Sequence, residues 1–210
     1  MTSRGGGATA HRDETEFASL VRRARAEAGR QAATAACEEL IDLARDGRTD
    51  ARDALAAVLV ENERPLWARE IASFALGCAG DRRAFETLVF LLNYRDPVRG
   101  ATAAHALVRL GDPRTARAAA ALATNELRTA YAVHPVRLLA ALRAPESVPT
   151  LVAVLARLLE RPDPHWPVAL ACVEGLGRIG DARARPVLAE AAAHHRLRAA
   201  AQAALARTGG

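Results

Sequence analysis

The chain has 210 residues, half of them hydrophobic and a quarter charged, which is enough for one soluble domain with a buried core. Its 29 basic residues are all arginine and outnumber 24 acidic residues, giving a net charge of +5. No apolar run approaches the ~20 residues of a membrane span, and no apolar leader follows Met1. We therefore expect a cytoplasmic protein with no membrane partner.

The arginine content has two explanations. Arginine suits phosphate and carboxylate partners, because its planar group donates paired hydrogen bonds. Alternatively, a GC-rich genome favours arginine and alanine codons together, and the 51 alanines support this compositional explanation. Aromatic residues make up only 4% of the chain, which predicts thin cores between closely packed helices.

The N-terminal residues 1–12 contain three consecutive glycines and are predicted to form a disordered arm before a single domain over 13–210. A sequence resembling a capping box, Asp13-Glu14-Thr15-Glu16, then begins a helix. Two further helices are predicted at 31–45 and 50–62, with their apolar residues on the inner faces.

A repeated motif follows, with copies at 75–84, 106–115 and 175–184 that share a glycine followed by aspartate. The interval from Gly111 to Gly180 is a little more than twice the interval from Gly80 to Gly111, which leaves room for one more copy. That copy falls near 144–147, where the Gly-Asp pair is lost. A period in the low thirties indicates a stacked supersecondary unit.

Each unit is predicted to be a pair of helices. In the second copy of the repeat, Asp96-Pro97-Val98-Arg99 begins the first helix, Gly111 ends it, and Asp112 caps its partner helix. Neither helix alone can bury its apolar stripe, so the pairs must stack. A last helix at 197–207 covers the end of the stack. The sequence therefore predicts an all-α solenoid of antiparallel helix pairs, with about five HEAT-like repeats and terminal capping helices.

These motifs, Asp96-Pro97-Val98-Arg99 with the following alanines and then Gly111-Asp112-Pro113-Arg114, resemble the HEAT repeat of the phycobilisome-lyase type. The resemblance covers roughly 31–207. It implies a right-handed α-solenoid whose second helices line a concave surface that holds a protein or nucleic acid. The departure near Pro145 predicts a bend or an altered surface there.

Paired charges recur with the repeat motif. They are the pairs Asp81 and Arg83, Asp112 and Arg114, and Asp181 and Arg183. A functional site normally occurs once in a chain, whereas a packing contact recurs in every repeat. We therefore interpret this ladder as structural, with each aspartate capping a helix and each arginine reaching a neighbouring repeat.

The sequence contains no recognisable catalytic set, cofactor motif or metal site. HEAT architecture resembles that of deoxyhypusine hydroxylase, whose iron-binding His-Glu pairs are absent here. The adjacent His194 and His195 would point about 100° apart on a helix and cannot easily share an ion. Cys37, Cys78 and Cys172 lie in apolar stripes, are too far apart for a CxxC site, and are odd in number. We therefore expect a protein that is not an enzyme.

Candidate binding residues are arginines on the second helices and two tryptophans in the first turns of equivalent helices. They are Arg117, Arg128, Arg157, Arg185, Trp67 and Trp166. The tryptophans would either anchor a partner or fill gaps between repeats. Tyr94 and Tyr131 fall in loops between repeats and fit either role.

The leading hypothesis is a non-catalytic scaffold or adaptor that binds a partner protein on its concave face. One alternative is a nucleic-acid-binding solenoid that resembles HEAT-like alkylpurine DNA glycosylases, although acidic residues are interspersed along the same helices. Another follows from the lyase resemblance and is a chaperone-like helper for chromophore or cofactor attachment. The sequence leaves the oligomeric state open.

Overall fold

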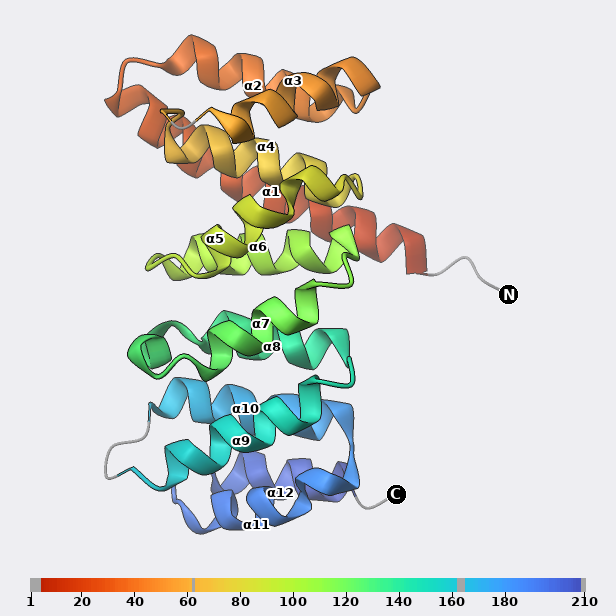
Figure 1. The fold of residues 1–210 in the computed structure, drawn as a ribbon, viewed down its shortest axis with the longest axis vertical. Coiled ribbons are helices and arrows are strands. Elements are labelled where there is room, and N and C mark those ends of the chain that lie inside the picture. The colour runs from red at the N-terminus through yellow and green to blue at the C-terminus, as the bar shows by residue number, and fades with distance from the viewer. Residues whose placement is uncertain (1–4, 62, 162–164, 209–210) are drawn as a thin grey trace. The chain divides into compact units, whose positions relative to one another are not determined.

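The computed structural model describes residues 5–61, 63–161 and 165–208, and within these ranges the chain is helical and contains no strand. Consecutive helices stack as pairs, as expected for an α-solenoid (Figure 1). The α-helices are α1 (Gly5–Arg30), α2 (Thr34–Asp46), α3 (Thr49–Val60), α4 (Leu66–Cys78), α5 (Phe85–Leu92), α6 (Pro97–Leu110), α7 (Thr115–Thr124), α8 (Val133–Leu142), α9 (Ser147–Leu159), α10 (Trp166–Ile179), α11 (Arg185–Ala193) and α12 (Arg198–Arg207). Short 3-10 helices are η1 (Arg82–Ala84), η2 (Glu126–Tyr131) and η3 (Ala182–Ala184).

The chain divides into two compact units, and the single domain over 13–210 stays a prediction. Unit 1 comprises residues 1–92 and 98–112, and unit 2 comprises 93–97 and 113–210. The helix predicted to begin at Asp13 begins at Gly5, within the predicted N-terminal arm 1–12. Residues 1–4 lie outside the described residues.

The glycines of the repeated motif end the first helix of each pair. Gly80, Gly111 and Gly180 have φ values of +76°, +63° and +77°, in the left-handed region where glycine carries no steric cost. In the copy that lacks glycine, Arg143 takes the same conformation with φ +51° and ends α8 by donating its backbone N–H to Leu139. The helix pair is therefore kept even where the motif is lost.

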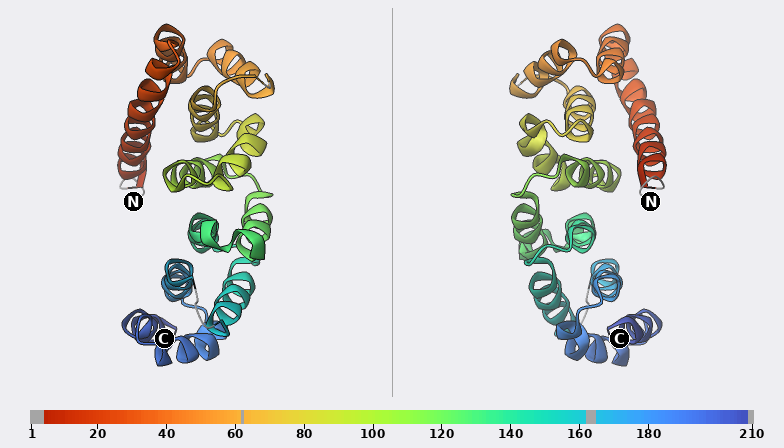
Figure 2. Two further views of the ribbon diagram at one scale, coloured as in Figure 1. Left: turned by 90° about the vertical axis from the view of Figure 1, so that its left-hand side faces the viewer. Right: turned by 90° about the vertical axis from the view of Figure 1, so that its right-hand side faces the viewer.

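Unit 1 is held together by the long helix α1, which packs against α2 and α4 and makes side-chain contacts with α6 (Figure 2). Its inner face buries the apolar residues Leu20, Val21, Ala24 and Ala28. Facing them, α4 buries Ile71, Phe74 and Leu76. One helix thus covers the first helices of three successive pairs.

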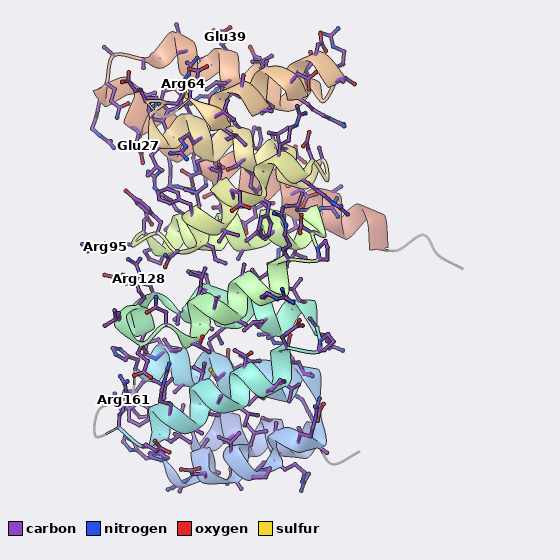
Figure 3. The ribbon with its side chains drawn as sticks, in the orientation of Figure 1. Glu27, Glu39, Arg64, Arg95, Arg128 and Arg161 are labelled. Carbon is purple, nitrogen blue, oxygen red and sulfur yellow. The ribbon has the colours of Figure 1, made fainter. Side chains whose placement is uncertain are left out.

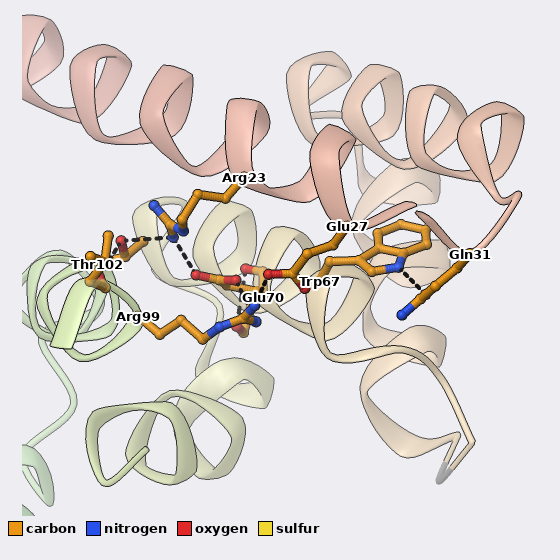
Figure 4. A network of polar contacts seen from close by, with 9 residues as sticks. Arg23, Glu27, Gln31, Trp67, Glu70, Arg99 and Thr102 are labelled. Atoms are coloured by element: carbon orange, nitrogen blue, oxygen red, sulfur yellow. Dashed lines mark hydrogen bonds and ion pairs between the residues drawn. The ribbon is translucent and has the colours of Figure 1, made fainter. Parts of the chain in front are cut away.

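A network of charged side chains is buried where α1, α4 and α6 meet (Figure 4). Glu70 is only 2% exposed and accepts from Arg23 Nη2 at 2.5 Å and from Arg99 Nη1 at 3.0 Å. Arg99 also pairs with Glu27, and Arg23 reaches Thr102 Oγ1 at 3.3 Å. Burial raises the pKa of Glu70, and the two neighbouring guanidinium groups oppose that effect. The network offsets two positive charges with two negative ones.

Unit 2 has a more local organisation. Its core helices contact near neighbours in sequence, with α8 and α9 packed on α10, and α10 and α11 packed on α12. The core is mainly aliphatic, and fully buried side chains include Leu139, Leu151, Leu155 and Leu176. Ala201 and Ala204 of α12 are buried against this core, as predicted for a capping helix.

Candidate partner-binding surface

Two of the predicted binding residues, Arg128 and Arg157, lie together in unit 2. They belong to a surface that we name the arginine edge, which Figure 3 marks by the labelled side chains of Arg95, Arg128 and Arg161 along one side of the unit. The arginine edge consists of Tyr94, Arg95, Leu127, Arg128, Tyr131, Arg157 and Arg161.

The centre of the arginine edge is η2, the 3-10 helix that follows α7. Asn125 caps it by accepting from the Leu127 backbone N–H at 3.1 Å. Arg128 has a non-helical φ of −124° and places its guanidinium 4.8 Å from the centre of the Tyr131 ring. The Arg128 Nη2 donates to the carbonyl oxygen of Asn93, which ties the segment 93–97 to η2. The loops after two successive second helices therefore form one surface.

Arg157 of α9 and Arg161, which follows the end of that helix, extend the surface. Arg157 Nη1 donates to the Thr124 carbonyl at 2.9 Å, at the end of α7 where carbonyls lack helical partners. Both arginines also lie close to Glu126, at 3.2 Å for Arg157 and 3.1 Å for Arg161. Arg157 thus ties α9 to the end of α7 and to η2.

An exposed apolar side chain, Leu127, lies among the charged side chains of the arginine edge. Leu127 is 96% exposed, and Tyr94 and Tyr131 are each 37% exposed. Tyrosine and arginine are the residue types that most often dominate binding energy at protein interfaces. The arginine edge therefore combines apolar contact area with hydrogen-bond donors.

Net charge is distributed unevenly between the two units. Unit 2 contains 14 arginines and 8 acidic residues, whereas unit 1 contains 15 arginines and 16 acidic residues. Unit 2 is therefore strongly basic and unit 1 is nearly neutral. A basic unit attracts acidic partners and raises their rate of association.

The other predicted binding residues do not join the arginine edge. Trp67 is 2% exposed and donates its indole N–H to Gln31 at 2.9 Å, so it fills the core of unit 1 and does not fit the role of a surface anchor. Trp166 is half-buried beneath the Arg196 guanidinium, 5.3 Å from its ring centre. Arg117 and Arg185 are exposed, and Arg185 Nη1 lies 3.5 Å from the Leu205 carbonyl.

Sequence reasoning missed Arg95, Leu127 and Arg161. A signal for the arginines was present, because Arg95, Arg128 and Arg161 are evenly spaced along the chain at an interval close to the repeat period. Equivalent loops in stacked repeats lie on the same side, so equal spacing places their side chains in a column. Leu127 had no comparable signal, since a single leucine in a loop is normally a packing residue.

At Asp81 and Asp181 the charge ladder has the capping role expected of it. Asp81 and Asp181 accept from the backbone N–H groups of Arg83 and Arg183, at 3.0 and 2.9 Å, and so begin η1 and η3. Arg83 also reaches Asp53 on the neighbouring α3 at 2.8 Å. Asp112 is buried and Arg114 is exposed at the start of α7.

The pair Asp181 and Arg183 predicts a specific pH dependence. Hydrogen bonds from the Arg183 side chain, and then from its backbone, lower the pKa of Asp181 from 3.8 to about 2. The stabilisation from ionised Asp181 is therefore complete above its unfolded-state pKa and is lost as the pH falls toward about 2. Denaturant unfolding from about pH 6 to about pH 2 should show wild type more stable than Asp181→Asn, with a difference that shrinks below about pH 4. A difference independent of pH would contradict this assignment.

Unit 1 contains a different kind of cluster, which the sequence did not indicate. Asp13, Cys78 and His105 have potential metal-ligating atoms that all lie within 4.8 Å of one another. Asp13 and Cys78 also line a pocket of about 660 Å³ between α1, α2 and α4. Because these three side chains lie far apart along the chain, no local motif indicates the cluster.

Comparison with known proteins supports the repeat architecture for part of the chain. Residues 132–206, within unit 2, match the family model of HEAT repeats. No curated protein matches the chain. Among solved structures, human deoxyhypusine hydroxylase in complex with glycerol is similar at 16% identity and a TM-score of 0.33, over 97% of this chain and 99% of that chain. Within the described residues, no helix is both long and apolar enough to cross a membrane.

Proposed function

We propose that the protein is a non-catalytic helical-repeat scaffold that binds a partner protein on the arginine edge. The observation that carries this proposal is the exposed Leu127 beside Arg128 and Tyr131. A leucine that is 96% exposed gains by burial against a partner, and the surrounding guanidinium groups suit carboxylates. The partner segment therefore carries acidic residues next to an apolar side chain.

The composition of the arginine edge favours a protein over a nucleic acid. Glu126 is 60% exposed between Arg157 and Arg161 and interrupts the positive surface, which opposes a continuous phosphate backbone more than a partner segment with single acidic residues. Leu127, the most exposed side chain of the edge, offers no aromatic face for stacking on a base, whereas the partly exposed rings of Tyr94 and Tyr131 favour the nucleic-acid alternative. The basic charge of unit 2 favours the nucleic-acid alternative, which the test below separates by its salt dependence. Likeness to phycobilisome-lyase-type repeats, a helper role in cofactor attachment and a cytoplasmic location stay predictions.

The test compares two charge-reversal variants of equal net charge. Arg95→Glu/Arg161→Glu changes the arginine edge, and Arg117→Glu/Arg185→Glu changes exposed arginines elsewhere in unit 2. Each immobilised protein is exposed to nuclease-treated lysate, and bound proteins are quantified by mass spectrometry. We expect specific partners to fall at least about tenfold with the first variant and to persist with the second, because only the first replaces attraction by repulsion at the edge.

Three results would contradict the proposal. Equal loss of partners with both variants would indicate attraction to net charge alone. Full retention with Arg95→Glu/Arg161→Glu would show that the arginine edge is not the binding surface. Binding of a labelled duplex or single strand that weakens with salt and is lost only in the edge variant would favour the nucleic-acid alternative. A peptide derived from the captured partner, titrated against Leu127→Asp, then tests the apolar contact directly.

A further inference from the structure

Asp13, Cys78 and His105 come from three different helices and meet at one place in unit 1. Asp13 lies on α1, Cys78 is the last residue of α4, and His105 lies on α6. His105 Nε2 is 2.6 Å from Asp13 Oδ1, and all three side chains are half-buried. A carboxylate oxygen, a thiol sulfur and an imidazole nitrogen thus converge.

This set of atoms matches the ligands that zinc-type ions use. Zn²⁺ is held by thiolate, imidazole and carboxylate groups, and sites with three protein ligands leave a fourth position open. Burial, together with the negative charge of Asp13, raises the pKa of the Cys78 thiol to about 12. Binding of a metal ion through the sulfur requires release of the thiol proton.

The surroundings of the cluster provide the support and the space that a metal site needs. Arg109 Nε lies 3.0 Å from Asp13 Oδ2, the second carboxylate oxygen, and this ion pair orients the carboxylate. The His105 ring stacks on Phe74, with 6.0 Å between ring centres, and Phe74 stacks in turn on Phe17 at 5.9 Å. Asp13 and Cys78 open on the 660 Å³ pocket, which gives an ion a route in and room for a fourth ligand.

We propose that Asp13, Cys78 and His105 form a binding site for one divalent transition-metal ion of the zinc type, with an open coordination position toward the pocket. The competing explanation is an ion-pair cluster in which Asp13 joins α1 to α6 through His105 and Arg109, and Cys78 is a bystander. The two explanations differ in what they require of the thiol. A metal site uses the sulfur as a ligand, whereas the ion-pair cluster does not.

Cobalt titration distinguishes them. The full chain is stripped with a chelator, dialysed and titrated with Co²⁺, whose thiolate complexes give a charge-transfer band in the near ultraviolet. We expect one Co²⁺ per chain, displacement by Zn²⁺, and loss of the band in Cys78→Ala. The matched variants Cys37→Ala and Cys172→Ala remove the other two thiols, both buried, and should keep the band.

Zinc affinity provides the second measurement, by competition with a chromophoric chelator. His105→Gln should weaken Zn²⁺ binding by more than the about 10- to 100-fold that losing an outer-shell partner costs. Zn²⁺ should also raise the Tm of the wild type and leave the Tm of Cys78→Ala unchanged. The proposal is overturned if the wild type gives no thiolate band, or if Cys78→Ala binds Zn²⁺ as tightly as the wild type. The Cys78 result decides the question even if His105→Gln fails to fold.

Discussion

Glu70→Gln should lower the free energy of unfolding of unit 1 by about 3–5 kcal/mol, because it removes one charge from a buried network. Glu70 is the shared acceptor for Arg23 and Arg99, and its side chain is 3% exposed. Glutamine keeps the size but removes one of the carboxylates that neutralise Arg99, whose side chain is only 6% exposed. The uncompensated positive charge then has little water to solvate it.

The measurement uses the two tryptophans as separate reporters, since Trp67 lies in unit 1 and Trp166 in unit 2. In a Trp166→Phe background, the fluorescence of Trp67 during denaturant unfolding reports on unit 1. The control is Glu38→Gln, which breaks the exposed pair with Arg25, and surface pairs of this kind contribute little. The double variant Glu70→Gln/Arg99→Gln restores neutrality and should be more stable than the sum of its single changes predicts. Equal, small effects of Glu70→Gln and Glu38→Gln would show that the network does not stabilise the unit.

Gly177→Ala should destabilise unit 2 by about 1–3 kcal/mol, although alanine favours helices over glycine. A Cβ at this position would lie 2.6 Å from Ala204 Cβ and 2.8 Å from Ala204 Cα. The second of these atoms is backbone, so the clash is relieved only if α12 moves away from α10. The missing side chain of Gly177 is therefore what permits the close approach of these two helices.

Trp166 fluorescence in a Trp67→Phe background measures the effect on unit 2. Gly29→Ala, followed by Trp67 fluorescence in a Trp166→Phe background, is the matched control, since nothing lies within 4 Å of an added Cβ there, and it should stabilise unit 1 by at most about 0.5–1 kcal/mol. Adding Ala204→Gly to Gly177→Ala removes the closer of the two clashes and should restore part of the loss. Unchanged or increased stability of the Gly177→Ala variant would mean that α12 is not packed as closely as described.

The helix pairs could be predicted from the sequence because their signals are local. The glycine that ends a first helix and the aspartate that follows it recur with the repeat, and the structure has them in these roles at Gly80 and Gly180. The copy near 144–147 shows the limit of such signals. There Arg143 adopts the left-handed conformation itself, at a modest cost that the packing of α8 and α9 offsets.

The candidate sites were less predictable because they depend on which loops and faces come together. Arg128 and Arg157 were predicted as binding residues, but their grouping with Arg161 required the positions of η2 and α9. Trp67 donates to Gln31, in the turn after α1, and the sequence did not place α1 against α4. The cluster of Asp13, Cys78 and His105 was also not predictable from local signals, because it forms only where α1 lies against α4 and α6.

The two units should also fold by different routes, because only unit 1 contains the long helix α1. In a stack where each repeat touches only its neighbours, structure can nucleate anywhere and spread along the chain. Contacts such as Asp13 with His105, which are distant in sequence, instead require closure of a long loop before they form. Unit 2 can therefore assemble or fray pair by pair, whereas α1 makes unit 1 a single cooperative body that completes its folding only after α6 has been synthesised.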